Sequence, residues 1–273
     1  MPELPEVETV KETLKRKVLN KTIIDVVINY DGIIESPSVR DFTNNIKNQT
    51  IRNITRRGKW LIFELDQYYL LSHLRMEGKY FLKNIDEPYT KHEHVIFKFS
   101  DNTDLRYQDT RKFGKMLLVD KDKLSESRPI KELGLEPWDN NLTSTYLKEK
   151  YKNKKLPIKT VLLDQSIIAG IGNIYDDEIL FLSGIFPTRK ACDITIDECD
   201  KIIKNTILVL EKAIKKGGTT IKSFTSSEGV HGLFQNELLV HSKKGELCSK
   251  CGTTIEKMVV GGRGTYYCSK CQK

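Results

Sequence analysis

The spacing of apolar residues predicts an amphipathic helix at the start of the chain. Valine and leucine recur every three or four positions and share one helical face, and the pattern ends near Asn20. The residues of this face are Val7, Val10, Leu14 and Val18. Short runs rich in Val, Ile, Phe and Tyr follow, separated by Asn, Asp and Gly. They predict strands at 22–30, 51–56, 60–66, 68–74, 78–82, 94–99, 103–108 and 114–119. So many short strands are typical of a β-sandwich or a barrel.

Helical spacing returns after a loop near 125–140, which contains Gly134 and Pro137. The predicted helices cover 143–151, 158–166, 173–183 and 197–215. The stretch 217–236 is rich in Gly, Ser and Thr without a clear period, which indicates a functional loop. A small cysteine-bearing β unit closes the chain. The sequence therefore predicts an α+β protein with domains at 1–130, 131–236 and 237–273.

Composition and charge narrow the possible partners. Apolar residues make up 38% of the 273 residues and charged residues 30%, which suits folded domains and argues against wholesale disorder. No apolar run is long enough for a membrane span, and the first residues lack the pattern of a signal peptide, so we expect a cytoplasmic protein without membrane contact. The net charge of +8 favours a polyanionic partner, although solubility alone also accounts for it.

Four of the six cysteines predict a metal site near the C-terminus. They follow the pattern C-x2-C-x16-C-x2-C and are Cys248, Cys251, Cys268 and Cys271. Each C-x2-C pair can direct two thiolates at one tetrahedral ion, so we expect one structural zinc; the alternative is four unligated cysteines. A site with four thiolates has no open position and does no catalysis. The run Gly261-Gly262-Arg263-Gly264 between the pairs predicts a hairpin tip that can approach a phosphate, or an ordinary glycine turn.

The N-terminus carries a candidate nucleophile. Removal of Met1, which precedes the small residue Pro2, would expose a secondary amine beside Glu3. An α-amino group has a pKa of about 8, so part of it is unprotonated near neutral pH and can condense with an aldehyde to a cationic iminium. A neighbouring carboxylic acid can protonate a departing or ring oxygen. On these residues alone, a proline-rich start before a helix remains an alternative.

A glycine corner before one helix suggests an anion-binding site. In Ala169-Gly170-Ile171-Gly172-Asn173 the glycines interrupt one helix, and Asn173 is placed to cap the next. Free backbone N–H groups at such a helix start bind phosphate well, yet most turns of this composition are merely turns.

Segments in order along the whole chain resemble the bacterial formamidopyrimidine-DNA glycosylases. They are Met-Pro-Glu-Leu-Pro-Glu-Val-Glu-Thr at 1–9, Arg-Arg-Gly-Lys at 56–59, His-Leu-Arg-Met at 73–76, Asp-Thr-Arg-Lys-Phe-Gly at 109–114, Gly-Ile-Gly-Asn-Ile-Tyr at 170–175 and the terminal finger. The resemblance implies an N-terminal helix with a two-layer β-sandwich as catalytic domain, a helical domain with a helix-two-turn-helix motif and a damaged-base loop, and a zinc-finger β-hairpin.

The resemblance also implies a base-excision repair enzyme that removes oxidised purines, such as 8-oxoguanine and formamidopyrimidines, and then nicks the strand as a lyase. Pro2 would attack C1′ of the damaged nucleoside, and Glu3 would protonate the sugar oxygen. By similarity, Lys59 serves β-elimination, Arg263 serves δ-elimination and Glu6 supports the cationic intermediate. The implied partner is double-stranded DNA with oxidised bases, bound by a monomer and associated with the bacterial nucleoid through DNA.

Other matching positions are assigned to DNA contact by the same resemblance. Met76, Arg111 and Phe113 would fill the space left by a flipped nucleotide, with Arg111 reading the opposite cytosine. Core packing is the alternative for Met76 and Phe113, although the charges at 111 and 112 argue against it. The positions assigned to the phosphate backbone are Lys59, His73, His92, Lys154, Asn173 and Arg263. His94 is interpreted as structural, and so are Cys192 and Cys199.

The sequence departs from the family pattern before the finger. The family usually has Val-Tyr-Gly-Arg or Val-Tyr-Gly-Lys, whereas this chain has Val240-His241-Ser242-Lys243. His241 thus replaces a phosphate-binding tyrosine, and its imidazole can still donate one hydrogen bond. Phe186 replaces a common histidine, which we interpret as a packing change.

Two other functions remain open at this level. The endonuclease VIII branch of the same superfamily prefers oxidised pyrimidines, but Leu4 and the separated Met76 and Arg111/Phe113 pattern favour the purine branch. A non-catalytic nucleic-acid-binding protein would use the glycine corner and the finger alone. Such a protein needs neither Pro2 nor Glu3.

Overall fold

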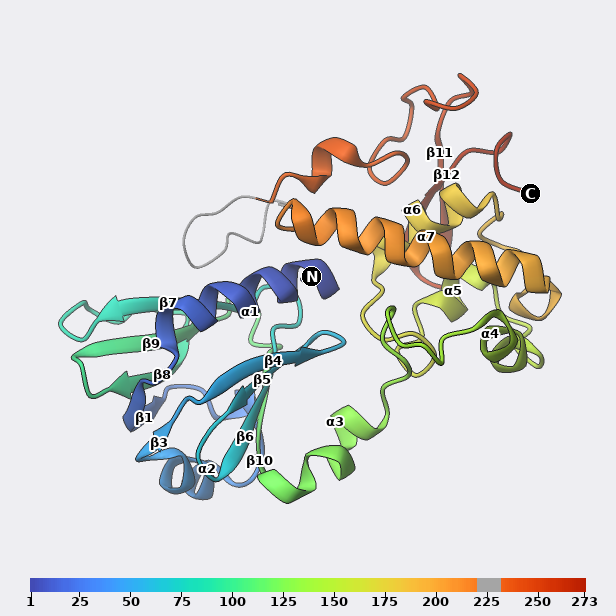
Figure 1. Ribbon diagram of the computed structural model, residues 1–273. Coiled ribbons are helices and arrows are strands. Elements are labelled where there is room, and N and C mark those ends of the chain that lie inside the picture. Colours follow the sequence, from blue (N-terminus) through green and yellow to red (C-terminus); the bar gives the residue numbers. More distant parts are fainter. Residues whose placement is uncertain (220–231) are drawn as a thin grey trace. The chain divides into compact units, whose positions relative to one another are not determined.

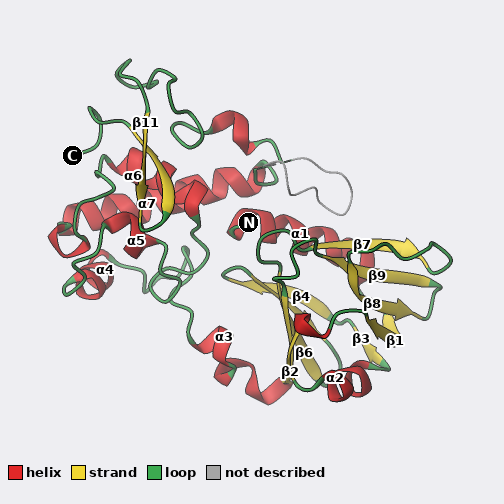
Figure 2. Cartoon of the chain, turned by 180° about the vertical axis from the view of Figure 1, so that it is seen from behind, coloured by secondary structure: helices red, strands yellow, loops and turns green. Residues whose placement is uncertain are grey.

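A computed structural model of the chain describes residues 1–219 and 232–273. The described residues divide into two compact units. The first comprises Met1–Lys131 with the described ends of Gly217–Gly232, and the second comprises Glu132–Lys216 and Leu233–Lys273. Figure 2 shows strands concentrated in the first unit and helices in the second. The grouping differs from the three expected domains, because the finger belongs with the helices and the start of the 217–232 segment belongs with the first unit.

The first unit is a two-layer β-sandwich with a long helix beside it (Figure 1). Within the described residues one sheet has the strands β3(Gln49–Thr50), β1(Thr22–Ile28), β8(Glu93–Phe99), β9(Thr103–Gln108) and β7(Lys79–Asn84), in that order. The other has β2(Ile34–Ser36), β10(Lys115–Asp120), β6(Tyr68–His73), β5(Trp60–Glu64) and β4(Asn53–Arg57). All described pairs are antiparallel except β2 with β10. The eight predicted strands are confirmed, with ends that match or differ by at most two residues.

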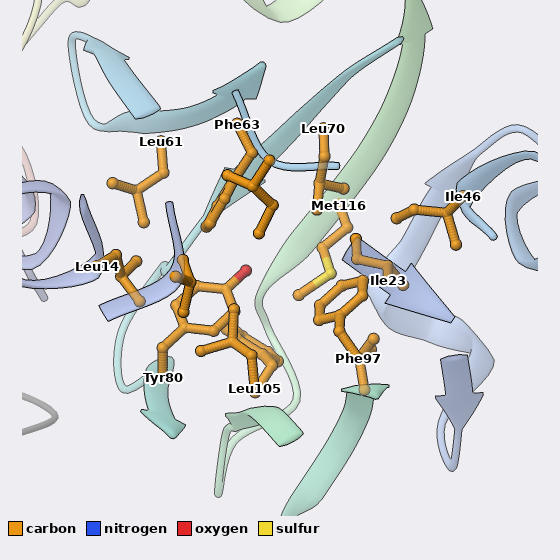
Figure 3. Packing of buried hydrophobic residues seen from close by; sticks show 14 of the residues in the cluster. Leu14, Ile23, Ile46, Leu61, Phe63, Leu70, Tyr80, Phe97, Leu105 and Met116 are labelled. Carbon is orange, nitrogen blue, oxygen red and sulfur yellow. The ribbon is translucent and has the colours of Figure 1, made fainter. Parts of the chain in front are cut away.

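The helix α1(Leu4–Val18) places the predicted apolar face in the core. Val7, Leu14 and Val18 are at most 1% exposed. In Figure 3 the side chain of Leu14 points toward Leu61 from β5 and Tyr80 from β7. Arg56 of β4 donates to Glu8 of the helix at 2.9 Å, which ties α1 to that strand. The hydrophobic period of the helix therefore sets which side of it meets the sheets.

A second helix in this unit, α2(Val39–Ile46), has no counterpart in the predicted elements. Ser38 caps it by accepting from the Asp41 backbone N–H at 3.1 Å. Its buried residues are Phe42 and Ile46, four positions apart, and Ile46 points into the same core in Figure 3. Two apolar anchors over eight residues give too short a periodic signal to separate this helix from a loop. The shorter elements of the unit are η1(Asp31–Ile33), η2(Lys121–Glu126) and α3(Arg128–Lys131).

The second unit confirms the predicted helices and the terminal β unit. It contains α4(Ser144–Tyr151), α5(Ile158–Leu162), α6(Asn173–Ser183), α7(Ile196–Lys215), β11(Glu256–Val260) and β12(Arg263–Tyr267), with short 3-10 turns η3(Ala191–Asp193) and η4(Phe234–Glu237). The long helix α7 begins with a capping box formed by Thr195 and Glu198. Helix α5 ends at Leu162, four residues earlier than predicted. No helix among the described residues is long and apolar enough to span a membrane.

Candidate functional site

The head of α1 presents the predicted nucleophile beside two buried carboxylates. Glu3 and Glu6 form a capping box in which the Glu6 carboxylate accepts from the Glu3 backbone N–H at 2.9 Å. Each of the two residues is 3% exposed, and Pro2 is also buried. The reciprocal hydrogen bonds fix the direction in which the chain enters the helix. They therefore hold Glu3, the residue that follows Pro2, in one conformation.

The other carboxylate oxygen of Glu6 accepts hydrogen bonds from the start of the 217–232 segment. Oε1 accepts from the Thr219 backbone N–H at 2.7 Å and from the Thr219 hydroxyl at 3.1 Å. Gly218 has φ 78°, and a Cβ there would lie 2.6 Å from the same oxygen, so a glycine is required. The rest of the predicted damaged-base loop, residues 220–231, lies outside the described residues.

Lys59 follows a tight turn between β4 and β5. Gly58 adopts φ 55°, a conformation that favours glycine, and its carbonyl accepts from Arg56 at 3.0 Å. The side chain of Lys59 is 6% exposed. Since Arg56 also bonds Glu8 of α1, this turn is anchored to the helix that begins at Leu4.

His73 is held neutral at the end of β6. Its Nδ1 accepts from the Arg75 backbone N–H at 3.0 Å, so the ring proton is assigned to Nε2. Burial, helped by the positive charges of Arg75 and Lys59, lowers the pKa of His73 to about 3. A T-shaped contact with Trp60 at 4.9 Å between ring centroids fixes the ring orientation. His73 therefore offers a single N–H donor at neutral pH without a charge.

Two connections between the sheets run side by side and carry the predicted DNA wedges. The turn 74–78 leads from β6 to β7, and the loop 109–114 leads from β9 to β10. Since β6 pairs with β10 and β7 pairs with β9, both crossings lie at the same end of the sandwich. Met76 is half-buried on the first and Phe113 is 49% exposed on the second, which argues against core packing.

The exposed side chains of the second crossing are supported by stacking. The Arg111 guanidinium lies over the Phe113 ring at 4.8 Å, and the Lys112 ammonium lies over the Tyr30 ring at 4.5 Å. Lys112 has φ 59°, in the left-handed region. This loop therefore presents an aromatic ring and two cations in a tight turn.

The same end of the sandwich contains His92 and His94. The backbone N–H of Asp109 donates to the His92 carbonyl at 3.0 Å, and the His94 ring contacts the Asp109 carbonyl at 2.8 Å. His94 is 3% exposed, as its structural interpretation requires. The His92 ring is half-buried. The structure thus brings Lys59, His73, Met76, His92, Arg111 and Phe113 to one rim of the first unit.

In the second unit the glycine corner is held by one glutamine. The Gln165 amide oxygen accepts from the Gly170 backbone N–H, and its amide nitrogen donates to the Ile171 carbonyl, both at 2.9 Å. The prediction that Asn173 caps α6 is wrong, because Gly172 is the N-cap residue. Asn173 instead donates to the Gly264 carbonyl at 3.0 Å, which links the helix start to the hairpin. An asparagine one position inside the helix cannot accept from its N2 or N3 amide as a cap does.

His241 is positioned by consecutive carboxylates of α6. Glu178 accepts from the backbone N–H groups of residues 239, 240 and 241 at 2.7 to 2.9 Å, and burial raises its pKa. Asp177 contacts Nδ1 of the His241 ring at 2.6 Å and Lys159 at 2.6 Å. The ring also packs against Tyr266 at 4.9 Å between centroids. Asp177 therefore fixes the ring by Nδ1 and leaves Nε2 as the atom that could reach a phosphate.

Arg263 and Lys154 occupy more exposed positions of this unit. The hairpin turn before Arg263 has φ 55° at Gly261 and 74° at Gly262, and a Cβ at Gly261 would lie 2.6 Å from the Thr160 hydroxyl. The glycines therefore let the tip approach α5 closely. Lys154 pairs with Asp164 at 3.4 Å, and its side chain is 43% exposed.

The four predicted ligands lie together in the finger. Their sulfur atoms are all within 4.8 Å of one another, with 3.8 Å between Cys248 and Cys271 and 3.5 Å between Cys251 and Cys268. Sulfur atoms of a tetrahedral site with Zn–S bonds of about 2.3 Å lie about 3.8 Å apart. The cluster thus fits a zinc ion. Cys199, by contrast, is buried, which raises the pKa of its thiol to about 11 and suits a structural role.

Several residues that shape these sites were not among the predicted ones. They are Arg56, Tyr107, Asp109, Lys159, Gln165, Asp177 and Glu178. Each acts through backbone groups or another side chain, so its sequence neighbours give no separate signal. A buried acid such as Asp109 becomes informative only when its hydrogen-bond partners are known.

Family models match three parts of the chain. Their descriptions are formamidopyrimidine-DNA glycosylase N-terminal domain for residues 1–116, formamidopyrimidine-DNA glycosylase H2TH domain for 133–225, and zinc finger found in FPG and IleRS for 245–273. Together they match well over half of the chain.

Curated relatives and solved structures agree with these matches. The chain is 49% identical to a Bacillus cereus formamidopyrimidine-DNA glycosylase over 100% of this chain and 99% of the relative, and 49% identical to that of Halalkalibacterium halodurans over 100% of both. It is similar to the Lactococcus lactis Fpg bound to DNA with an abasic site, with TM-score 0.93 and 39% identity over 100% of both chains. A Lactococcus lactis variant bound to DNA containing Fapy-dG gives TM-score 0.94 and 40% identity over 100% of both.

The buried neutral His73 predicts a loss of stability on acidification. In the unfolded chain histidine takes up a proton below its ordinary pKa of about 6.5, whereas folded His73 stays neutral down to about pH 3. Between these values the unfolded state binds more protons, so the free energy of unfolding falls as pH falls, by about 2 kcal/mol from pH 7 to pH 5. The His73→Gln variant should lack this part of the loss.

The measurement is urea unfolding of the first unit, followed by Trp60 fluorescence in a Trp138→Phe background, because these are the two tryptophans. Wild type and His73→Gln are compared at pH 7 and pH 5. Equal losses in both proteins would contradict the assignment, as would an NMR titration in which the His73 ring protonates near pH 6.5.

Proposed function

The chain belongs to the formamidopyrimidine-DNA glycosylase family of base-excision repair glycosylases, and we propose that it removes oxidised purines and then cleaves the strand as a lyase. The observation that carries the proposal is the head of α1, where Pro2 precedes two buried carboxylates joined in a capping box. A DNA-binding module without chemistry has no use for that arrangement.

The proposed reaction begins with attack of the Pro2 nitrogen on C1′ of the damaged nucleoside. The bond between C1′ and the base breaks, the base departs with a proton, and Glu3 protonates the ring oxygen as the sugar opens. The product is an iminium between Pro2 and C1′, which draws electrons from the sugar. Its positive charge would be favoured near Glu6, whose carboxylate already bonds the Glu3 N–H.

Strand cleavage follows from that electron sink. Loss of a proton from C2′ expels the 3′ phosphate, and a second elimination expels the 5′ phosphate. By similarity to the family we assign Lys59 to the first elimination and Arg263 to the second. The buried position of Lys59 on an anchored turn supports a fixed role in proton transfer.

The rim of the first unit supports a role in holding the opened duplex. Extruding a base costs a few kcal/mol, and inserted side chains offset part of that cost. We propose that Met76 and Phe113 fill the vacated space and that Arg111 contacts the opposite base. Backbone contacts are assigned to His73, His92, Lys154, Asn173 and His241.

Oxidised pyrimidines are the main alternative substrates. One of the similar structures is the Lactococcus lactis FPG bound to DNA containing an oxidised pyrimidine, at TM-score 0.92 and 39% identity. The proposal of a purine preference therefore rests on the separate positions of Met76 and the Arg111/Phe113 pair. Measuring excision from duplexes with an oxidised purine or an oxidised pyrimidine compares the two hypotheses.

Borohydride trapping tests the proposed nucleophile. The protein is incubated with an 8-oxoguanine:cytosine duplex and borohydride, and the adduct is digested with trypsin. The sugar remnant should be found on the N-terminal peptide Pro2–Lys11, because Lys11 is the first cleavage site. Lys59→Ala should keep this adduct, whereas a protein that retains Met1 should form none. An adduct mapped to Lys59 would assign the nucleophile to a lysine.

Arg111 should set the preference for the base opposite the lesion. A guanidinium has only donors, so it suits the acceptor face of cytosine and loses a contact against adenine. A good base contact is worth ~1–3 kcal/mol, so excision opposite cytosine should be faster by about ten-fold to a hundred-fold. Single-turnover excision on both duplexes should give a smaller ratio for Arg111→Ala. An equal loss on both duplexes, with a flatter salt dependence, would place Arg111 on a phosphate.

Loss of zinc should weaken DNA binding before it unfolds the protein. The finger is a small terminal unit, and its hairpin bonds the start of α6, where Asn173 donates to the Gly264 carbonyl. Cys268→Ser should lower bound zinc from about one ion per chain and weaken duplex affinity, while far-UV circular dichroism stays nearly unchanged. Cys192→Ser is the matched control, because Cys192 lies outside the cluster. Unchanged duplex affinity in the metal-free protein would defeat this account.

A further inference from the structure

The two crossings between the sheets share one buried side chain. Tyr107 of β9 is fully buried, and its hydroxyl oxygen fills the space in front of two glycines. A Cβ added at Gly78 would lie 2.2 Å from that oxygen, and one added at Gly114 would lie 1.7 Å from it. Gly78 ends the turn that carries Met76, and Gly114 ends the loop that carries Arg111 and Phe113. The phenol therefore touches both segments at once.

Asp109 completes the link from the side of the loop. Its carboxylate accepts from the backbone N–H groups of Arg111 at 3.0 Å, Phe113 at 2.9 Å and Gly114 at 2.8 Å. The Tyr107 hydroxyl donates to the same carboxylate at 3.4 Å. Asp109 has no accessible surface, and within residues 1–219 and 232–273 no lysine or arginine forms an ion pair with it. The loop backbone itself supplies the donors that make the buried charge tolerable.

A further contact joins the two crossings at their surface. The Thr110 hydroxyl hydrogen-bonds the Glu77 carboxylate, so the residue after Asp109 meets the residue after Met76. Burial raises the pKa of Tyr107, and the Asp109 charge adds to that effect, so the phenol stays a donor. Tyr107 and the Thr110–Glu77 bond therefore connect the turn 74–78 to the loop 109–114 at two points.

We propose that Tyr107 and Asp109 are positioning residues for reading the base opposite the lesion: together they set the Arg111/Phe113 loop and lock it against the Met76 turn. The proposal rests on the proposed function, since it concerns how the wedge residues meet the duplex. Neither residue contacts DNA in this account. Asp109 acts through the backbone of residues 111, 113 and 114, and Tyr107 acts through Gly78, Gly114 and the Asp109 carboxylate. The loss of either side chain should therefore alter discrimination more than chemistry.

The test uses Tyr107→Phe and Asp109→Asn in the full-length protein. Tyr107→Phe removes the hydroxyl that touches both glycines, and Asp109→Asn replaces an acceptor oxygen by an amide that faces N–H donors. Tyr80→Phe is the matched control. Tyr80 is equally buried, packs against Tyr107 at 5.2 Å between ring centroids, and its hydroxyl donates to Ser72 at 2.7 Å rather than to a residue of 74–78 or 109–114.

Each variant is measured in two ways. Single-turnover excision of 8-oxoguanine opposite cytosine and opposite adenine gives the discrimination ratio, and cleavage of a single-stranded abasic oligonucleotide reports the chemistry without an opposite base. Amide hydrogen exchange at residues 111, 113 and 114 reports the anchoring of the loop. Tyr107→Phe should lower the ratio about three- to ten-fold, as expected for one hydrogen bond, and Asp109→Asn should lower it further. Both should speed the exchange and leave single-strand cleavage within about two-fold.

Three results would overturn the positioning role. One is a Tyr107→Phe variant whose ratio of excision opposite cytosine to excision opposite adenine equals that of the wild type. This result would decide the question even if Asp109→Asn does not fold. Another is unchanged amide exchange in both variants. The third is an equal fall of the ratio in Tyr80→Phe, because a general softening of the core would then explain the effect.

The same experiment separates this proposal from the proposed function. A wild-type protein that excises neither duplex and forms no borohydride adduct defeats the proposed function, and the positioning role falls with it. A wild-type protein that excises and discriminates, while Tyr107→Phe discriminates equally, defeats the positioning role alone.

Discussion

The pairing of β6 with β10 and of β7 with β9 is the constraint on which the rim of the first unit depends. Two of the places where the chain changes sheets, from β6 to β7 and from β9 to β10, join strands that are neighbours within each sheet. Because both crossings connect the same pair of neighbouring strand positions, they are forced side by side. Residues more than thirty positions apart, such as Met76 and Arg111, reach one end of the sandwich for this reason. Lys59 and His73 arrive there through the pairing of β5 with β6, in which Trp60 lies opposite His73.

The second constraint is the cost of burying a carboxylate. In both units, hydrogen bonds from backbone N–H groups offset that cost. Asp109 in the first unit accepts from the backbone N–H groups of residues 111, 113 and 114, and Glu178 in the second accepts from those of residues 239–241, each beside a candidate functional side chain. A carboxylate buried without such partners would cost several kcal/mol, so the loop and the carboxylate stabilise each other only in one geometry. The arrangement fixes the loop more narrowly than apolar packing would, because hydrogen bonds are directional. His241 is held in place by the same device that holds Arg111 and Phe113.

The sequence was sufficient for elements with a clear period or a ligand spacing. The helix carrying Val7 and Leu14, the strands rich in β-branched residues and the cysteine cluster were all found, because periodicity and C-x2-C spacing report local geometry. Helix α2 gives no such signal, because only Phe42 and Ile46 mark its buried face. Asn173 is the first residue of α6 and not its N-cap, a difference of one position that a helix boundary inferred from the sequence does not resolve. The roles of Tyr107, Asp109 and Glu178 depend on partners brought together by the fold, and no local pattern encodes them.

Ordering the Arg111/Phe113 loop before DNA binds saves a free energy similar in size to that of the contact proposed for Arg111. An immobilised side chain at an interface costs about 0.5–1.5 kcal/mol when it is ordered only on binding. A base contact of the kind proposed for Arg111 is worth ~1–3 kcal/mol, so ordering two or three loop residues could consume most of it. In this fold the loop backbone is ordered during folding, because Asp109 and Tyr107 hold it, and the Phe113 ring supports the Arg111 guanidinium. The discrimination proposed for Arg111 thus depends on the whole loop 109–114. If that loop were mobile, the cost of ordering it would offset the free energy of the guanidinium contact.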